Sequence, residues 1–585
     1  MKTAAEAVRE GRRLGAKGDF AAAAKSTDQA LARWPDDAEL HLLRAAVAER
    51  LGDHDTVVRH VERFEELAPE REPPDTMCGW ALLQLERAAE AKVRLERATA
   101  RQPENATAWT NLGLARKELG DVAGAIESHQ RAMEVAPERP APYLNLAGIE
   151  LDQGRPDRAI EMLRPLRSRQ PGHLDAARLE AMLHLYSASF TPEQAAAAHR
   201  GAGAVAHAMI VDEPARFMLP RSPDRCLRVA FVSPDLKHHS VASFLLPLIE
   251  SLDRSRVQPV CYHVSPLSDE MTGRFRAASI FHDVARLSDR ELVRKIRGDR
   301  IDVAIDVAGL TQGGRLPAFA ARLAPVQVTW LGYPATTGVP AMDARFVDSL
   351  TDPEGSEPLC TERLVRLDPV FLCWRSRVEA PPPPRTPTDG RGPVFASFND
   401  LAKVSQSTLD AWARILVRLP EARLLLKAYG LRWETARNWL ASAFEERGVD
   451  ASRVEMMAFT ATQEEHLALY GRVDLALDTF PYNGTTTTLE ALWMGTPVIG
   501  LEGVGHHARV GLTLLDAIGR RDLVAPDLDG YVERAVAVAS DGAALERDHA
   551  TLRAAVESSP LRDEKGFAGR FEKAVRGLWR AWCRG

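Results

Sequence analysis

The chain has 585 residues, 45% of them hydrophobic and 27% charged, a balance typical of globular proteins that excludes wholesale disorder. At about 150 residues per domain this length predicts three or four domains. The net charge of −6 gives no reason to expect nucleic acid or an anionic membrane as a partner. The six cysteines lie far apart with no CxxC pair, which excludes a disulfide scaffold and the common zinc patterns.

The N-terminal residues lack the apolar core of a signal peptide, and no run of about 18 apolar residues follows them. We therefore expect a cytoplasmic protein without a membrane partner.

The first third of the chain repeats with a period of 34 residues. One series consists of prolines: Pro35, Pro69, Pro103, Pro137 and Pro171. A second series, 24 residues earlier, consists of small residues: Gly11, Ala45, Gly79, Gly113 and Ala147. A third, 12 residues before the prolines, consists of Ala23, Val57, Ala91, Ala125 and Ala159. Glycine recurs between the predicted helices at Gly18, Gly52, Gly120 and Gly154, with Glu86 as the exception.

This order of small residues and proline resembles the tetratricopeptide repeat, most clearly in residues 108–138, AWTNLGLARKELGDVAGAIESHQRAMEVAPE. The resemblance implies an all-α superhelix of about five repeats over residues 1–172, followed by a helical connector over 173–224. Asn111 and Asn145 occupy the same repeat position. Their amides could bind the backbone of a peptide acceptor on the concave face, or could satisfy polar groups between repeats.

From Cys226 the pattern changes to β-rich runs that alternate with helical stretches. This alternation predicts parallel sheets covered by helices, in one lobe over residues 225–378 and a second over 393–585. A proline-rich linker, residues 379–392, separates the lobes. We expect two doubly wound lobes facing a cleft, with ligands at the carboxyl ends of the strands. The final helical run, residues 567–585, is expected to pack back across the lobes.

The strongest local signal for a ligand lies in residues 473–499, VDLALDTFPYNGTTTTLEALWMGTPVI. A buried strand leads into Asn483 and Gly484, and Thr485, Thr486 and Thr487 then open a helix. The free N–H groups of a helix N-terminus favour a pyrophosphate. Glu490, about one turn further on, could accept hydrogen bonds from the ribose hydroxyls. The alternative is that the threonines only cap the helix.

Together with the repeats, five stretches resemble the protein O-GlcNAc transferase family, including its SPINDLY-type relatives. These stretches are VAFVSPDLKHHSVASF (229–244), PVQVTWLGYPATTG (325–338), FNDLAKVSQSTLDAWARIL (398–416), QEEHLALYGRVDLALDTFPYNGTTTT (463–488) and GHHARVGLTLL (505–515). The resemblance implies a GT-B fold of two Rossmann-like lobes. It also implies inverting transfer of GlcNAc from UDP-GlcNAc to Ser or Thr hydroxyls of proteins, with no metal or other cofactor.

The resemblance also assigns roles to single residues. Lys403 matches the lysine that neutralises the diphosphate of the leaving nucleotide, where a solvated surface lysine is the alternative. His239 matches a histidine near the sugar and the acceptor hydroxyl, whereas its neighbour His238 has no such match. His466 matches a histidine that packs near the uridine base, with an exposed helix residue as the alternative.

Two further groups follow from the same motifs. His506 and Arg509 occupy a family HxxR position and are expected to support the phosphate end, unless Arg509 pairs with a local carboxylate. The expected cleft lining consists of Asp306, Gly309, Thr311, Gly332, Tyr333 and Pro334. The D-x-D triplet at Asp527 lies outside the nucleotide motif and is interpreted as a solvated turn, not a metal site.

Departures from the animal enzymes leave the donor open. Those enzymes carry other residues at the positions of Asp400, Gln463 and Thr485, whereas their aspartate at the Glu490 position keeps a carboxylate. GDP-fucose and UDP-glucose are therefore alternative donors. A non-catalytic scaffold, whose repeats recruit partners while the lobes are inactive, is the alternative from another class of function.

Overall fold

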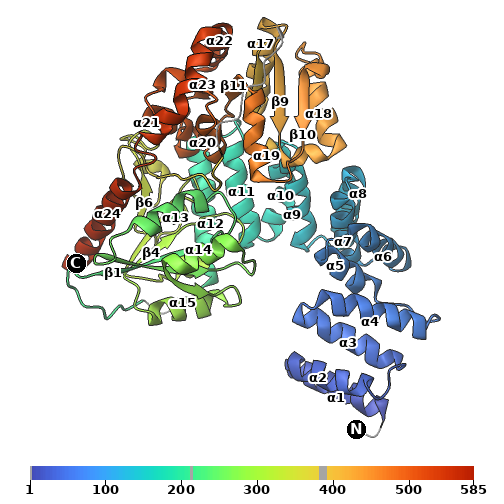
Figure 1. Ribbon diagram of the computed structural model, residues 1–585. Coiled ribbons are helices and arrows are strands. Elements are labelled where there is room, and N and C mark those ends of the chain that lie inside the picture. Colours follow the sequence, from blue (N-terminus) through green and yellow to red (C-terminus); the bar gives the residue numbers. More distant parts are fainter. Residues whose placement is uncertain (1–2, 211–214, 381–391) are drawn as a thin grey trace. The chain divides into compact units, whose positions relative to one another are not determined.

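The computed structural model describes residues 3–210, 215–380 and 392–585 (Figure 1). Most of the predicted proline-rich linker therefore lies outside the described residues. The chain divides into two compact units, residues 1–149 and 150–585.

The first unit consists of helices, as the repeat predicts. They are α1 (Ala4–Ala16), α2 (Phe20–Leu31), α3 (Ala38–Leu51), α4 (His54–Leu67), α5 (Asp75–Gln84), α6 (Ala88–Arg101), α7 (Ala106–Glu118), α8 (Val122–Val135) and α9 (Pro140–Asp152), which crosses the division between the units. The second helices of three pairs, α4, α6 and α8, end 34 residues apart, each two residues before a proline of the series. Proline lacks the N–H that another helical turn requires, so it ends each repeat at a fixed place.

The turns inside the repeats explain the glycine series. Gly18, Gly52 and Gly120 adopt positive φ angles of 80°, 72° and 84°. The exception, Glu86, takes the same left-handed conformation, with φ 59°. The backbone turn is thus kept in the third repeat although glycine, which adopts it without steric strain, is absent there.

Close helix packing explains the small residues. A Cβ atom added to Gly79 would lie 2.5 Å from Cγ of Leu95 on the partner helix. Ala45, Ala91 and Ala125 have no exposed surface. The high alanine content of this unit is therefore a consequence of helices that touch at short range.

The second unit begins with α10 (Pro156–Arg169), α11 (Leu174–Tyr186) and α12 (Pro192–Met209). Its first lobe contains a parallel sheet of order β3-β2-β1-β4-β5-β6-β7. The strands are β1 (Leu227–Ser233), β2 (Val257–His263), β3 (Ile280–Asp283), β4 (Val303–Asp306), β5 (Val326–Thr329), β6 (Ala344–Val347) and β7 (Arg363–Arg366). The sequence patterns did not predict β3, β6 and β7, which are four residues long and lie toward the edges.

The second lobe repeats this topology in a parallel sheet of order β10-β9-β8-β11-β12-β13. Its strands are β8 (Val394–Ser397), β9 (Arg423–Lys427), β10 (Val454–Met457), β11 (Leu475–Leu477), β12 (Val498–Leu501) and β13 (Val524–Ala525). In both sheets the strand order reverses direction beside the first strand of the lobe, the arrangement of a Rossmann-type sheet.

Helices cover both sheets. They are α13 (Ala242–Ser251), α14 (Glu270–Ala278), α15 (Asp289–Gly298) and α16 (Leu316–Ala320) in the first lobe, and α17 (Gln406–Arg418), α18 (Glu434–Glu445), α19 (Gln463–Ala468), α20 (Thr486–Trp493), α21 (Val510–Ala517), α22 (Leu528–Ser540), α23 (Gly542–Glu557) and α24 (Glu564–Arg584) after the linker.

The two faces of the first sheet are covered by distant parts of the chain. Ala230 and Val232 point into a core shared with α11 and α12, which fall in the predicted connector. Phe231, between them in β1, points to the opposite face and stacks on Phe571 of α24 at 6.0 Å between ring centroids. The expected return of the last helix is confirmed, since α24 lies against the first lobe although its sequence follows the second (Figure 1).

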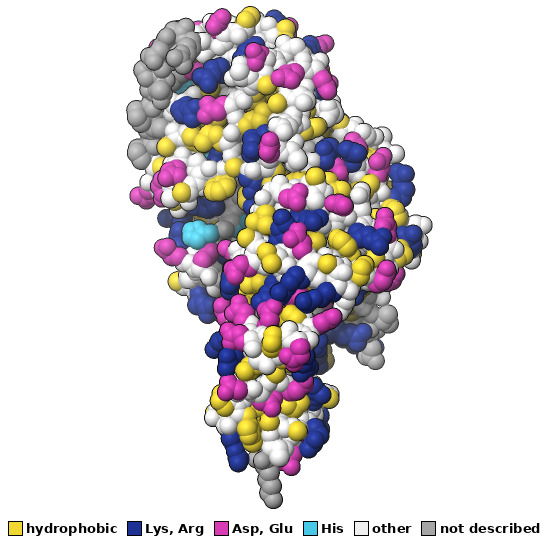
Figure 2. Space-filling model, turned by 90° about the vertical axis from the view of Figure 1, so that its right-hand side faces the viewer, with side chains coloured by type: hydrophobic (Ala, Val, Ile, Leu, Met, Phe, Trp, Pro, Cys, Tyr) yellow, Lys and Arg dark blue, Asp and Glu magenta, His cyan; other side chains and the backbone are white. Residues whose placement is uncertain are grey.

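On the face drawn in Figure 2, Lys and Arg side chains are interspersed with Asp and Glu among the described residues. No helix in the described ranges is both long and apolar enough to cross a membrane.

Candidate functional site

Most of the predicted site residues lie where the strand order reverses in each sheet. In the first lobe this point lies between the carboxyl ends of β1 and β4, which lead to His239 and Asp306. In the second lobe it lies between β8 and β11, which lead to Lys403 and to Asn483. Open α/β sheets bind their ligands at such points.

The Asn483–Gly484 turn of the second lobe is built on a buried carboxylate. Asp478 directly follows β11, and its Oδ1 accepts hydrogen bonds from the backbone N–H of Gly484 at 2.7 Å and of Thr479 at 2.8 Å. The Asn399 amide donates to the same oxygen at 3.2 Å. Burial raises the pKa of Asp478 to about 6, and Lys403 opposes this rise.

The start of α20 is open to a ligand. Thr485, in the cap position, makes no side-chain hydrogen bond to the first turn. The hydroxyl of Thr487 donates to Asn399 at 2.9 Å and that of Thr488 to the Gly484 carbonyl at 3.1 Å. Capping therefore does not account for the threonines, and Thr485 and Thr486 remain half-buried beside the unsatisfied N–H groups of the helix.

Lys403 is held against this turn and is not a solvated surface lysine. It ends a short 3₁₀ helix, η2 (Leu401–Lys403), and its Nζ donates to the Asn483 carbonyl at 3.0 Å. The ammonium also lies 4.4 Å from the ring centroid of Tyr482. Burial lowers the pKa of Lys403, while Asp478 and Asp400 counteract it. The result is a positive charge at the turn, with limited access to water.

Glu490 lies one turn into α20 and is buried. Its Oε1 accepts a hydrogen bond from Gln463 at 2.7 Å, and its Oε2 contacts Nε2 of His466 at 3.1 Å. Nδ1 of His466 in turn contacts Nζ of Lys427 at 3.0 Å, and burial lowers the pKa of that lysine. His466 is thus buried in a polar cluster and is not an exposed helix residue.

Arg377 joins the two lobes at this cluster. It lies in the last part of the first lobe before the linker, and it donates to Gln463 at 3.1 Å and to Glu490 at 3.5 Å. It also contributes to lowering the pKa of His239. A guanidinium therefore lies between the histidine loop of the first lobe and the ribose carboxylate predicted for the second.

His239 lies in the loop after β1, with its side chain 44% exposed. Burial of the ring is the main cause that lowers its pKa, and Asp235, 3.8 Å from Nδ1, opposes this effect. The Val241 N–H donates to Nδ1 at 3.3 Å. Because this bond uses the Nδ1 lone pair, the neutral ring carries its proton on Nε2 and presents an N–H donor.

The expected cleft lining of the first lobe is largely a packed loop. Asp306 is buried at the end of β4, and its carboxylate accepts the N–H groups of Ala308 and Gly309 at 3.1 and 3.0 Å. A Cβ atom on Gly309 would lie 2.4 Å from Cβ of Tyr333, and the Tyr333 hydroxyl bonds His199 of α12 at 2.7 Å. These residues fix the loop against α12.

The other three lining residues occupy the same region. The Thr311 hydroxyl donates to the Ala308 carbonyl at 2.8 Å. A Cβ atom on Gly332 would lie 2.0 Å from the Val307 carbonyl oxygen, so only glycine fits between the two loops. Pro334 lines a small cavity of about 40 Å³ beside Asp352 and His506.

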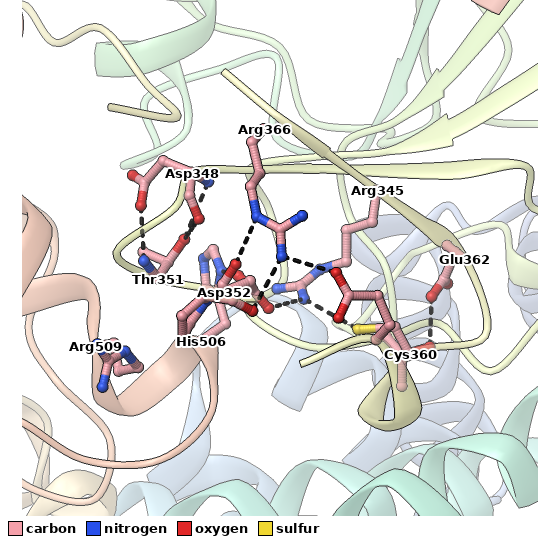
Figure 3. A network of polar contacts seen from close by, with 12 residues as sticks. Arg345, Asp348, Thr351, Asp352, Cys360, Glu362, Arg366, His506 and Arg509 are labelled. Carbon is pink, nitrogen blue, oxygen red and sulfur yellow. Dashed lines mark hydrogen bonds and ion pairs between the residues drawn. The ribbon is translucent and has the colours of Figure 1, made fainter. Parts of the chain in front are cut away.

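His506 and Arg509 connect the lobes (Figure 3). Nδ1 of His506 contacts Asp352 of the first lobe at 2.6 Å, and Asp352 also pairs with Arg345 at 3.1 Å. Although burial opposes it, Arg345 and His506 lower the pKa of Asp352. Arg509 pairs with Glu502 at 2.8 Å, the local partner foreseen as the alternative, and donates to the Leu350 carbonyl at 2.6 Å.

This interlobe network also touches the donor turn. The Asn483 N–H donates to the carbonyl of His507 at 2.9 Å, and the Asn483 side chain accepts from Gly511 at 3.2 Å. His506 and Arg509 therefore support the turn from behind, through the backbone. Direct contact of either residue with a donor stays a prediction.

The two asparagines of the repeat array make no side-chain hydrogen bond within residues 3–210. Asn111 is buried and Asn145 is half-buried. The structure therefore does not show them satisfying polar groups between repeats.

Four polar residues of the site were missed in the sequence: Asn399, Asp478, Arg377 and Lys427. Lys427 and Asp478 lie at or directly after a predicted strand end, so their position was a usable signal. Arg377 carried no such signal, because its contacts depend on how the lobes pack. Asp527 caps α22 by accepting the Gly530 N–H at 2.7 Å, so its triplet opens a helix and is not a turn. No group of three or more His, Cys, Asp or Glu side chains suited to a metal ion occurs among the described residues.

Two doubly wound lobes in direct contact, with a buried cation and an open helix start at the switch point of the second, define a glycosyltransferase of the GT-B class joined to helical repeats. Glycosyl transferase family 41 matches residues 175–374 and 387–571, and tetratricopeptide repeat models match 8–56, 77–141 and 117–183. The chain therefore belongs to glycosyl transferase family 41.

Similar proteins agree with this assignment. The probable UDP-N-acetylglucosamine–peptide N-acetylglucosaminyltransferases SPINDLY of Petunia hybrida and Arabidopsis thaliana are 38% and 36% identical over 371 residues, which cover 62% of this chain. These matches span 40% and 41% of the two relatives, less than half of their length. A solved mutant of Thermobaculum terrenum O-GlcNAc transferase is 34% identical, with a TM-score of 0.80 over 87% of this chain and 97% of its own.

Proposed function

We propose that this protein transfers N-acetylglucosamine from UDP-GlcNAc to serine or threonine hydroxyls of proteins, with inversion and without a metal ion. The observation that carries the proposal is Lys403, whose ammonium is held at the Asn483 carbonyl beside the open start of α20. A cation and free N–H groups at one point suit a departing diphosphate. The printed names of the SPINDLY proteins and of the Thermobaculum structure supply the sugar and the peptide acceptor.

The residues of the second lobe would bind the donor. Lys403 and the N–H groups of Thr486 and Thr487 would neutralise the diphosphate, as a divalent metal does in other transferases. Glu490 would accept the ribose hydroxyls, and His466, which contacts Phe398 at 5.5 Å between ring centroids, would pack near the base.

The reaction itself is a single displacement. The acceptor hydroxyl oxygen forms a bond to C1 of the sugar, the bond from C1 to the diphosphate oxygen breaks, and UDP leaves with that electron pair. The hydroxyl proton is released to solvent. His239 would orient the acceptor oxygen through its Nε2–H, which follows from the hydrogen bond at Nδ1. Attack from the side opposite the diphosphate inverts the configuration at C1.

The test is incubation of the protein with a protein lysate and labelled UDP-GlcNAc, with GDP-fucose and UDP-glucose as parallel donors. Intact-mass analysis should show a gain of one N-acetylhexosamine on Ser or Thr, unchanged by EDTA, and NMR of the product should show the β-anomer. Transfer from GDP-fucose alone would refute the donor assignment. Loss of activity in EDTA, restored by a divalent ion, would refute metal independence.

A further inference from the structure

The largest cavity described in the first unit belongs to the repeat array and is distant in sequence from the residues assigned above. It has a volume of about 560 Å³ and is lined mainly by α5 and α7, with contributions from α3 and α6. This volume falls within the range of pockets that hold a ligand or a large side chain. We call it the Trp80 pocket, after the indole that lines it.

One buried amide of the pocket is unused. Asn111 lines the pocket, its residue is 7% exposed, and its side chain makes no hydrogen bond within the described residues of the unit. A primary amide offers two donors and an acceptor, and leaving them unpaired in a buried position is costly. Asn111 is therefore available to a backbone peptide group that enters the pocket.

The charges at the pocket are also unbalanced. Asp75 lies at its base but is neutralised by Arg94, Arg97 and Arg101, at 3.3, 2.6 and 3.0 Å. Glu49 and Glu72 line the same pocket, are exposed, and form no ion pair among the described residues. The free carboxylates give the mouth of the pocket a net negative charge.

Trp80 adds a surface that suits a cation. Its side chain is 36% exposed, and no arginine or lysine of the described residues covers its ring. Trp is the ring that attracts cations most strongly, and the aliphatic stem of a lysine packs on its face. Met77, which occupies the repeat position of Asn111, supplies a further apolar contact.

We propose that the Trp80 pocket binds a lysine or arginine side chain of an extended polypeptide, with the ligand backbone hydrogen-bonded to Asn111. The cationic head would lie between Trp80 and the carboxylates of Glu49 and Glu72. The proposal rests on the proposed function in one respect, because it makes this polypeptide the acceptor. The repeats would then select acceptors that carry a basic residue at a set distance from the modified hydroxyl.

The experiment is a calorimetric titration of the full chain, without nucleotide sugar, using a 12-residue peptide of Ala, Ser and Thr with one central lysine. Matched peptides carry norleucine or glutamate at that place. The lysine peptide should bind about tenfold more tightly than the norleucine peptide, a cation–π contact and two carboxylates being worth at least that factor. The glutamate peptide should bind most weakly.

Variants assign the effect to the pocket. The double change Glu49→Gln with Glu72→Gln should abolish the preference for lysine over norleucine while leaving norleucine binding unchanged, and Trp80→Ala should weaken both peptides. Glu104→Gln, an exposed carboxylate outside the pocket, is the matched control. Equal affinities for lysine and norleucine, or a lysine preference that survives the double change, would overturn the proposal. Because no donor is present, the absence of sugar transfer in a separate assay would refute the proposed function without touching this result.

Discussion

The switch points of the two lobes share one topology but differ in chemistry. In the second lobe the strands β8 and β11 lead to a cluster of charged groups and hydrogen-bond donors around Lys403, Asp478 and Asn483. In the first lobe β1 and β4 lead to one exposed histidine and to a glycine loop whose polar groups are satisfied within the loop.

This difference indicates a division of labour. A diphosphate needs fixed positive charge, which the second lobe provides by burying a lysine beside a helix N-terminus. An acceptor hydroxyl needs orientation and space, which the half-exposed His239 provides. The same sheet thus serves two purposes, because the loops at its carboxyl edge carry the function. The predictions below test this division from the largest expected effect to the smallest.

Lys403→Met should reduce kcat by about 10²- to 10³-fold, the usual loss when one group that stabilises developing negative charge is removed. UDP affinity should fall as well, because the ammonium acts on the diphosphate in the ground state too. Steady-state kinetics and UDP titration measure both effects. Lys565→Met, an exposed lysine at the start of α24, is the matched control. A fully active Lys403→Met would contradict the assignment.

His239→Ala should reduce kcat by about 10²-fold, the lower end of the range for a positioned acid–base or orienting group. Because His239 acts on the acceptor, the dissociation constant of UDP should stay unchanged. His238→Ala, the exposed neighbour, should leave both quantities as they are. An equal loss in the two variants would show that the loop, and not the His239 ring, is what matters.

Arg377→Ala should weaken UDP binding by about tenfold, which corresponds to the loss of one hydrogen bond to a charged group. The reason is that Arg377 helps keep Glu490 ionised and aimed at the ribose. Direct titration of the variant with UDP measures the effect, with Arg414→Ala on the exposed surface of α17 as control. Unchanged UDP affinity would remove Arg377 from the donor site.

Asp478→Asn should change the pH dependence of UDP binding. The pKa of Asp478 is about 6 in the folded chain, so its proton is bound more tightly than in an unfolded one, and lowering the pH through 6 removes a negative charge beside the diphosphate. UDP should bind about two- to fivefold more tightly at pH 5.5 than at pH 7 because of this group. The Asn variant should lack that increment. By the same sign, the stability contributed by protonated Asp478 is lost as the pH rises from about 4 to 6.

Features set by short stretches of sequence were predictable, and features set by packing between distant stretches were not. The repeat register followed from proline and small-residue spacing, and even its exception, Glu86, keeps the left-handed turn. The Asn483–Thr487 turn was equally visible, because its residues are consecutive. The contacts of Arg377 with Glu490 and of His506 with Asp352 join residues 113 and 154 positions apart. No local pattern encodes such contacts, which explains why His506 was expected at the phosphate end and lies in the interlobe network.

The division between the lobes is tested most directly by calorimetric titration of UDP into the wild-type chain, Lys403→Met and His239→Ala under one condition. The account predicts that Lys403→Met weakens UDP binding by at least about tenfold while His239→Ala binds UDP as the wild-type chain does. Full UDP affinity in Lys403→Met, together with a loss in His239→Ala, would contradict the placement of the diphosphate in the second lobe.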